Sequence, residues 1–73
     1  IAGGAEERVE EYIRINSKLD AKGDYVLPDF NLSRLAEYLA VGRASLYRIL
    51  NDFENRGLIK KDGKKIYIIK GDL

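Results

Sequence analysis

Two short amphipathic segments lie almost back to back in the middle of the 73-residue chain, and only Val41 and Gly42 separate them. The first runs from about Leu32 to Ala40, and the second from about Arg43 to Asn55. In each, apolar residues recur at the three- and four-residue spacing that predicts one buried face of a helix. These residues are Leu32, Leu35, Ala36 and Leu39, and then Leu46, Ile49, Leu50 and Phe53. Two helices joined so tightly must pack on each other, which predicts a helix-turn-helix.

The turn between these helices has two possible backbone shapes. Ala36 is small enough for a close crossing, and glycine is usual four residues after such a position, because the turn often needs a positive φ. This chain has Ala40 there and Gly42 two residues later. Either Ala40 carries about 1 kcal/mol of left-handed strain, or the turn is shaped around Gly42. The side chains expected to fill the contact are Leu35, Leu39, Val41, Leu46 and Ile49.

A helix and a short strand precede this pair. Residues from about Glu6 to Leu19 predict the helix, with Gly23 as its stop signal. One stripe of this helix is shared by Val9, Tyr12, Ile13 and Asn16, and Ile15 and Leu19 are paired four residues apart. Tyr25–Leu27 reads as a strand, and Pro28 prevents its direct continuation into a helix. The caps available to the next helix are Asp29 and Asn31.

The C-terminal segment predicts a β-hairpin. Strands at Leu58–Lys60 and Ile66–Ile69 flank an Asp62-Gly63 turn signal, and Gly57 ends the preceding helix. The whole chain therefore predicts a single α+β domain, residues 1–73. It is a winged helix-turn-helix with three helices, a short strand and a C-terminal hairpin wing. The helix-turn-helix spans about 32–55 and the wing about 58–69.

The composition excludes several classes of protein. The chain contains no cysteine and no histidine, so disulfides and the usual zinc sites are excluded. We therefore expect no cofactor in this domain. No apolar run approaches the roughly 20 residues of a membrane span, so we expect a cytoplasmic protein without a membrane partner. The start, IAGG, resembles a cut end, and we expect a fragment of a longer protein.

Charge is divided unevenly along the chain. Residues 1–42 hold five Lys/Arg and eight Asp/Glu, a net charge of −3. Residues 43–73 hold eight Lys/Arg and four Asp/Glu, a net charge of +4. A basic half of this kind indicates a polyanionic partner. The alternative is a basic face that is merely solvated.

The exposed face of the second helix of the pair is where such a partner would bind. A helix fits the major groove of DNA, where an arginine fork matches O6 and N7 of guanine. The hairpin lysines, which include Lys60, are placed to reach phosphates. The residues predicted to bind DNA are Arg43, Ala44, Ser45, Tyr47, Arg48, Asn51, Lys61, Lys64 and Lys65.

Each of these predictions has a purely structural alternative. Arg43 can be a surface charge at a helix start, and Arg48 can pair with Asp52 four residues on. Tyr47 can pack back against the protein. The hairpin lysines can protect an exposed edge strand from aggregation.

Several short motifs occur in a fixed order: "LP" before the helix pair, "LAEYL", "R-x-SLYR-x-L", "GLI" and "GKKIYI". In this order and spacing they resemble the DNA-binding domain of Crp/Fnr-type bacterial transcription regulators. The resemblance covers about Glu7 to Leu73 and implies sequence-specific DNA binding in transcription regulation. It also implies an effector-sensing β-barrel domain and a long dimerisation helix outside this chain. The parent protein is then expected to be a homodimer, and the isolated fragment a monomer.

The resemblance implies roles for particular residues of the second helix. Arg48 matches an arginine that typically contacts guanine, and Arg43 matches one that contacts a phosphate or a base. Ser45 matches a small hydroxyl residue that meets the DNA backbone or a base. Ala44 stands where many relatives carry a glutamate that accepts from cytosine N4, and Tyr47 stands where glycine or serine is frequent. We therefore expect the DNA sequence preferred by this chain to differ from the one that those relatives prefer.

Two other functions compete with DNA binding. A winged helix can serve as a protein interaction module, but the basic helix and hairpin favour a polyanion. An enzyme is rejected, because the chain has no Cys or His to form a nucleophile–base pair. The carboxylates Asp24, Asp29 and Glu37 form no catalytic constellation.

Overall fold

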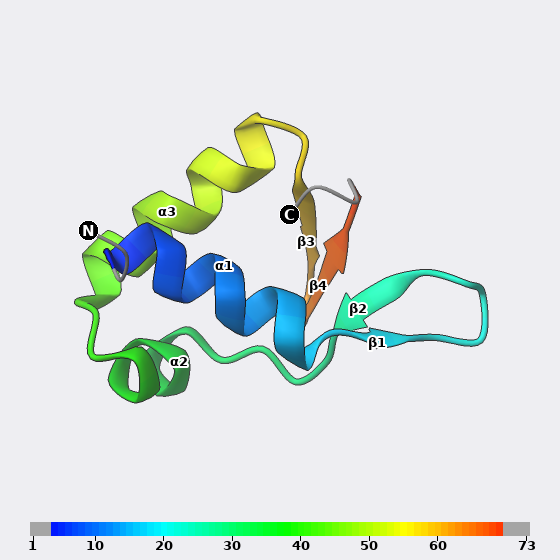
Figure 1. The fold of residues 1–73 in the computed structure, drawn as a ribbon, viewed down its shortest axis with the longest axis horizontal. Helices are drawn as coiled ribbons and strands as arrows, with labels where there is room; N and C mark the ends of the chain where they lie inside the picture. The colour runs from blue at the N-terminus through cyan, green and yellow to red at the C-terminus, as the bar shows by residue number, and fades with distance from the viewer. Residues whose placement is uncertain (1–3, 70–73) are drawn as a thin grey trace.

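The protein is seen here in a computed structural model, which describes residues 4–69; residues 1–3, where the cut end was inferred, lie outside the described part. Its elements are α1 (Ala5–Asn16), β1 (Lys18–Leu19), β2 (Tyr25–Leu27), α2 (Leu32–Leu39), α3 (Arg43–Asn55), β3 (Ile59–Asp62) and β4 (Lys65–Ile68). The strands form one antiparallel sheet in the order β1-β2-β4-β3. In Figure 1 the helices gather on one side and the sheet lies on the other. The predicted α+β winged helix-turn-helix is confirmed, with β3 and β4 as the wing.

One hydrophobic core joins the helices to the sheet. Its largest fully buried side chains are Val9, Ile13, Leu46, Leu50, Phe53, Ile59 and Ile66. Leu27, Leu35 and Ala36 complete the cluster, and Leu39, Val41 and Ile49 pack against it while partly exposed. The predicted stripe of α3 is therefore the buried one. Of the predicted α1 stripe, Val9 and Ile13 are buried, Tyr12 is half-buried and Asn16 is exposed.

The helix-turn-helix turn adopts the first of its two possible shapes. Ala40 has φ 56° and ψ 45°, in the left-handed region, whereas Gly42 is extended at φ −61° and caps α3. The N–H of Val41 donates to the carbonyl of Ala36 at 2.9 Å, the bond that closes a Schellman turn. Gly57, with φ 75°, follows the end of α3 as predicted. Alanine thus holds a conformation that glycine adopts more easily.

The end of the first helix differs from its prediction. α1 ends at Asn16, Ser17 caps it, and Lys18–Leu19 form β1 instead. Leu19 pairs with Tyr25 across the antiparallel β1–β2 ladder, because that pairing satisfies backbone groups that a longer helix would have used. The predicted contact of Ile15 with Leu19 is wrong, since both side chains are more than 60% exposed, at 66% and 61%. Gly23 is not a helix stop but stands in the β1–β2 loop at φ 89°.

The hairpin is shifted in register from its prediction. β3 begins and ends later than expected, and its last residue, Asp62, pairs with Lys65 at the start of β4. The loop is therefore Gly63 and Lys64 rather than Asp62-Gly63, and Gly63 has φ 61°. A positive φ at the first loop residue alone is the type II′ pattern, which matches the twist of the strands. Ile69, predicted in the second strand, lies beyond β4.

Candidate nucleic-acid interface

The sequence-predicted helix face lies on the outside of α3. Because the core stripe of α3 is buried, the side chains of Arg43, Ala44, Tyr47 and Arg48 are exposed. Ser45 and Asn51, also predicted to bind, are half-buried at the margins of this face. Gly42 caps α3 without a side-chain hydrogen bond, so the positive end of the helix dipole is not neutralised by a capping side chain. The face therefore combines the helix dipole with Arg43 and Arg48.

The Arg48 side chain does not use Asp52 as a partner. Instead, Arg56 Nη1 donates to Asp52 Oδ2 at 3.1 Å and to Glu6 Oε2 at 3.3 Å. The hydrogen bond to Asp52 is the main reason that the pKa of Arg56 is raised. Within residues 4–69, neither Arg43 nor Arg48 forms a side-chain hydrogen bond or ion pair. Both guanidinium groups are therefore available to an external anion or base.

Tyr47 does not pack back into the core. Its side chain is 55% exposed, and the Lys61 ammonium lies 5.0 Å from the centroid of its ring. This cation–π contact joins α3 to the first strand of the wing. Tyr47 and Lys61, predicted independently from two separate segments, are thus brought together.

Strand alternation separates the wing lysines from one another. Lys61 opposes the buried Ile66 and so shares the core-facing side of the sheet, whereas Lys60 opposes Tyr67 on the other side. Lys61 is half-buried against α3, while Lys60, Lys64 and Lys65 are exposed. Of the predicted phosphate contacts, Lys64 and Lys65 therefore remain open to solvent at the hairpin tip, and Lys61 does not.

The start of α2 contributes Arg34, which was not among the residues predicted to bind DNA. Asn31 is the cap of α2, since its side-chain oxygen accepts from the N–H of Arg34 at 2.9 Å. The N–H of Phe30 donates to the Lys64 carbonyl at 2.6 Å, which joins this helix start to the wing tip. The exposed Arg34 follows in the first turn of the helix whose start is joined to the wing tip in this way. Nothing in the linear pattern marks it, because the link is a tertiary backbone contact.

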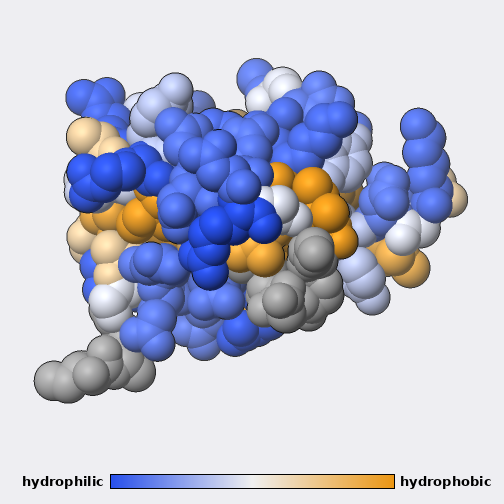
Figure 2. All heavy atoms as spheres, turned by 90° about the horizontal axis from the view of Figure 1, so that it is seen from above, coloured by the Kyte–Doolittle hydropathy of each residue, from blue (hydrophilic) through white to orange (hydrophobic). Residues whose placement is uncertain are grey.

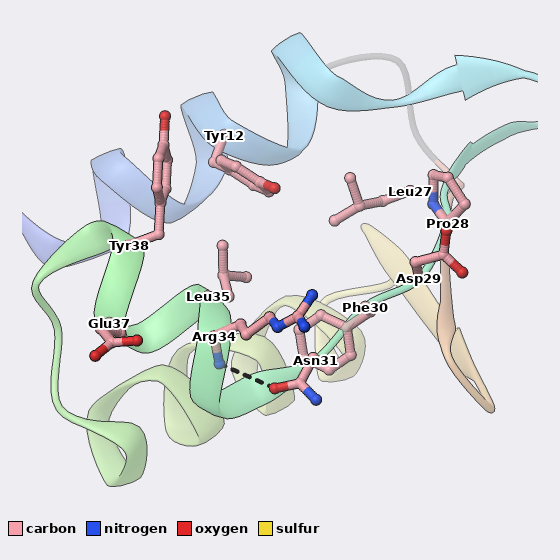
Figure 3. A pocket seen from close by; sticks show the side chains of 10 residues that line it. All are labelled: Tyr12, Leu27, Pro28, Asp29, Phe30, Asn31, Arg34, Leu35, Glu37 and Tyr38. Atoms are coloured by element: carbon pink, nitrogen blue, oxygen red, sulfur yellow. Dashed lines mark hydrogen bonds between the residues drawn. The ribbon is translucent and has the colours of Figure 1, made fainter.

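A groove of about 510 Å³ lies beside this region, between α1, α2 and the loop that precedes α2. Figure 3 shows Tyr12 and Tyr38 on its helical walls, and their rings meet edge to face at 5.5 Å. Asp29 and Glu37 both line the groove, whereas Asp24 does not. The carboxylates considered for catalysis are therefore not brought together as a set of three.

Residues 4–69 contain no group of three His, Cys, Asp or Glu side chains placed to hold a metal ion. None of their helices is both long enough and apolar enough to cross a membrane.

The comparison with known families agrees with this geometry. Residues 7–72 match the family model described as a Crp-like helix-turn-helix domain, so the match runs from α1 to beyond β4. No curated protein matches the chain. Such domains bind DNA in transcription regulation and are typically not enzymes. The protein therefore belongs to the family of Crp-like helix-turn-helix DNA-binding domains.

Proposed function

We propose that this domain reads a specific sequence of double-stranded DNA, with α3 in the major groove and the wing tip on the phosphate backbone. The observation that carries the proposal is the outer face of α3, where Arg43 and Arg48 are exposed and form no ion pair within residues 4–69. In a helix-turn-helix the second helix enters the major groove while the first crosses the backbone. In this domain α3 is the second helix of the motif and α2 is the first.

Base reading is assigned chiefly to Arg48. It lies in the second turn of α3, and its fork can donate to O6 and N7 of one guanine, which lysine cannot do in the same way. Arg43, at the start of α3, is assigned to a phosphate or a flanking base, and Ser45 to the DNA backbone. Ala44 has no acceptor, so this chain does not make the cytosine contact that a glutamate there would make.

Phosphate contacts are assigned to the wing tip and to the start of α2. Lys64 and Lys65 are exposed at the tip, and Arg34 is exposed in the first turn of α2. Charges of this kind add affinity for any duplex and make binding depend on salt. These contacts position the domain, whereas α3 supplies the discrimination.

The parent protein is proposed to be a homodimer that reads two half-sites one helical turn apart, roughly 34 Å. The 73-residue chain alone then binds one half-site weakly as a monomer. The contacts assigned here use side chains of this chain and need no cofactor.

The second candidate is a protein interaction module. Figure 2 shows a face that is mostly hydrophilic, with hydrophobic atoms confined to a band across its middle. Protein interfaces are depleted in charge at their centres, so the exposed arginines of α3 favour DNA.

A mobility-shift assay with random-sequence duplexes tests the proposal. Wild type should form a salt-sensitive complex, and the double variant Arg43→Ala/Arg48→Ala should lose it. Arg56→Ala is the matched control, because Arg56 is already paired with Asp52 and Glu6. Absence of any complex with wild-type protein would reject DNA binding and favour the protein interaction module.

A further inference from the structure

Lys61 is surrounded by three side chains of α3. Its Nζ donates to Asn51 Oδ1 at 2.9 Å, lies 3.7 Å from Glu54 Oε1, and sits 5.0 Å from the centroid of the Tyr47 ring. Tyr47, Asn51 and Glu54 follow at four- and three-residue intervals, so they form one stripe along the helix. The ammonium thus has a hydrogen-bond acceptor, a counter-charge and a π face, all from one element.

The sheet register accounts for this position. Lys61 shares a face with Ile59, which is 1% exposed, so its side chain starts from the core side of β3. The Lys61 backbone N–H also donates to Glu54 Oε2 at 3.5 Å. The side chain is 26% exposed, whereas Lys64, in the loop, is open to solvent. Two polar partners of this ammonium, Asn51 and Glu54, are therefore supplied by α3 and not by an external anion.

We propose that Lys61 is a positioning residue for base recognition, which fixes the side-chain amide of Asn51 and the ring of Tyr47 on the groove-facing side of α3. The inference rests on the proposed function, since it assumes that α3 enters the major groove. A lysine ammonium has three donors and no acceptor. The amide of Asn51 must therefore turn its oxygen toward Lys61, which leaves the amide N–H₂ directed away from the wing.

The fixed amide predicts a base preference. An Asn51 that offers only its N–H₂ group is a donor, and in the major groove guanine, thymine and adenine each present an acceptor, whereas cytosine presents only its N4 donor. Asn51 should therefore disfavour cytosine at the base that it faces. A freely rotating amide would present either group and discriminate less.

Binding-site selection with the 73-residue chain tests this arrangement. Lys61→Met keeps the aliphatic length of the side chain but removes its charge and donors. It should lower the discrimination against cytosine at one position about fivefold or more, without changing the preference assigned to Arg48. The salt slope on a scrambled duplex should stay as in wild type.

Lys64→Met is the matched control, because its side chain is exposed at the wing tip. It should flatten the slope of log K against log salt by about 0.9 and leave every base preference intact. If Lys61→Met instead behaves like Lys64→Met, Lys61 contacts a phosphate and the inference is wrong. Melting of both variants distinguishes a lost preference from a lost fold.

The variant Asn51→Asp gives a readout that a merely structural role would not move. An aspartate keeps an oxygen for Lys61 but offers only acceptors, so the preference at the same base should shift toward cytosine or adenine, whose exocyclic amines donate. An unchanged preference would show that Asn51 does not face a base.

NMR of the free chain separates this inference from the proposed function. The ε-methylene protons of Lys61 should be shifted upfield by the Tyr47 ring, and Tyr47→Leu should abolish the shift. If wild type selects no DNA sequence, the proposed function fails, and the inference about base reading fails with it while the upfield shift remains. If the shift is absent in wild type, the inference fails even when DNA binding is sequence-specific.

Discussion

The backbone N–H of Phe30 donates a 2.6 Å hydrogen bond to the carbonyl oxygen of Lys64. This bond links the loop before α2 to the tip of the wing, two segments that are distant in sequence and adjacent in space. The antiparallel pairing of β2 with β4 continues the link, since Leu27 pairs with Ile66. The wing tip and the start of the helix-turn-helix therefore form one surface, which is where phosphate contacts are proposed.

Removal of a wing-tip charge should flatten the salt dependence of DNA binding. Lys64→Ala and Lys65→Ala should each reduce the slope of log K against log salt by about 0.9, because one phosphate contact is lost. Affinity for all duplexes should fall about equally. Fluorescence anisotropy at several salt concentrations measures the slope, with Lys60→Ala, farther from the tip, as the control. Equal slopes in all four proteins would mean that neither wing-tip lysine contacts a phosphate.

Arg48→Ala should weaken specific binding by about 1–3 kcal/mol and relax the preference at one base pair. The reason is that the guanidinium fork, unpaired within residues 4–69, is proposed to contact one guanine. Binding-site selection on wild type and variant compares the preferences position by position. Arg56→Ala removes the same charge from a residue that already pairs with Asp52, so it should leave every preference unchanged. Identical preferences for Arg48→Ala and wild type, with evenly reduced affinity, would assign Arg48 to a phosphate.

Leu46→Ala should destabilise the domain by about 2–5 kcal/mol, because it opens a cavity at a fully buried position. For a domain of this size that loss approaches the whole stability. Urea denaturation followed by circular dichroism measures it. Tyr38→Ala is the control, since Tyr38 is 75% exposed and should cost far less. A Leu46→Ala protein as stable as wild type would contradict the burial of this face.

Ala40→Gly should stabilise the domain by up to about 1 kcal/mol, because glycine adopts the left-handed conformation without steric strain. Thermal denaturation should show a higher midpoint. The control is Gly42→Ala: Gly42 has a negative φ, and an added Cβ would meet Ser45 Oγ at an ordinary 3.9 Å. If Ala40→Gly destabilises the domain and Gly42→Ala destabilises it strongly, the residue with the left-handed conformation is Gly42 and not Ala40.

The 73-residue chain should sediment as a monomer at micromolar concentration. α1 is short, and its buried residues, Val9 and Ile13, are used by the domain's own core. Sedimentation velocity without DNA checks this prediction. A tight dimer would contradict it and would implicate the exposed Ile15 and Leu19 as a contact between copies.

The local pattern determined the elements whose spacing is strongly periodic. The stripe of Leu46, Leu50 and Phe53 defined both the extent of α3 and the direction of its outer face, because burial of one helix face leaves only one choice for the other. The cap at Asn31 and the glycine after α3 were also readable, since each acts within a few residues. The same reasoning selected Arg43 and Arg48 for the candidate site.

Long-range contacts decided the rest. β1 replaced the last turn of the predicted first helix because Leu19 finds its partner in Tyr25, a pairing that helical spacing does not reveal. The sequence left two shapes open for the turn, and the structure has its left-handed residue at Ala40, whose N–H bonds back to the carbonyl of Glu37.

The lysines of the wing show most clearly which features the local sequence determines and which depend on long-range contacts. Lys60, Lys61 and Lys64 are chemically identical in the sequence, and a register shift of one residue exchanges the faces of a strand. Only the pairing of Lys61 with Ile66 turned one of them toward Asn51 and Tyr47 while the others stayed in solvent. The sequence alone therefore determined that the wing is basic, and the tertiary structure decided which of its charges is held against α3.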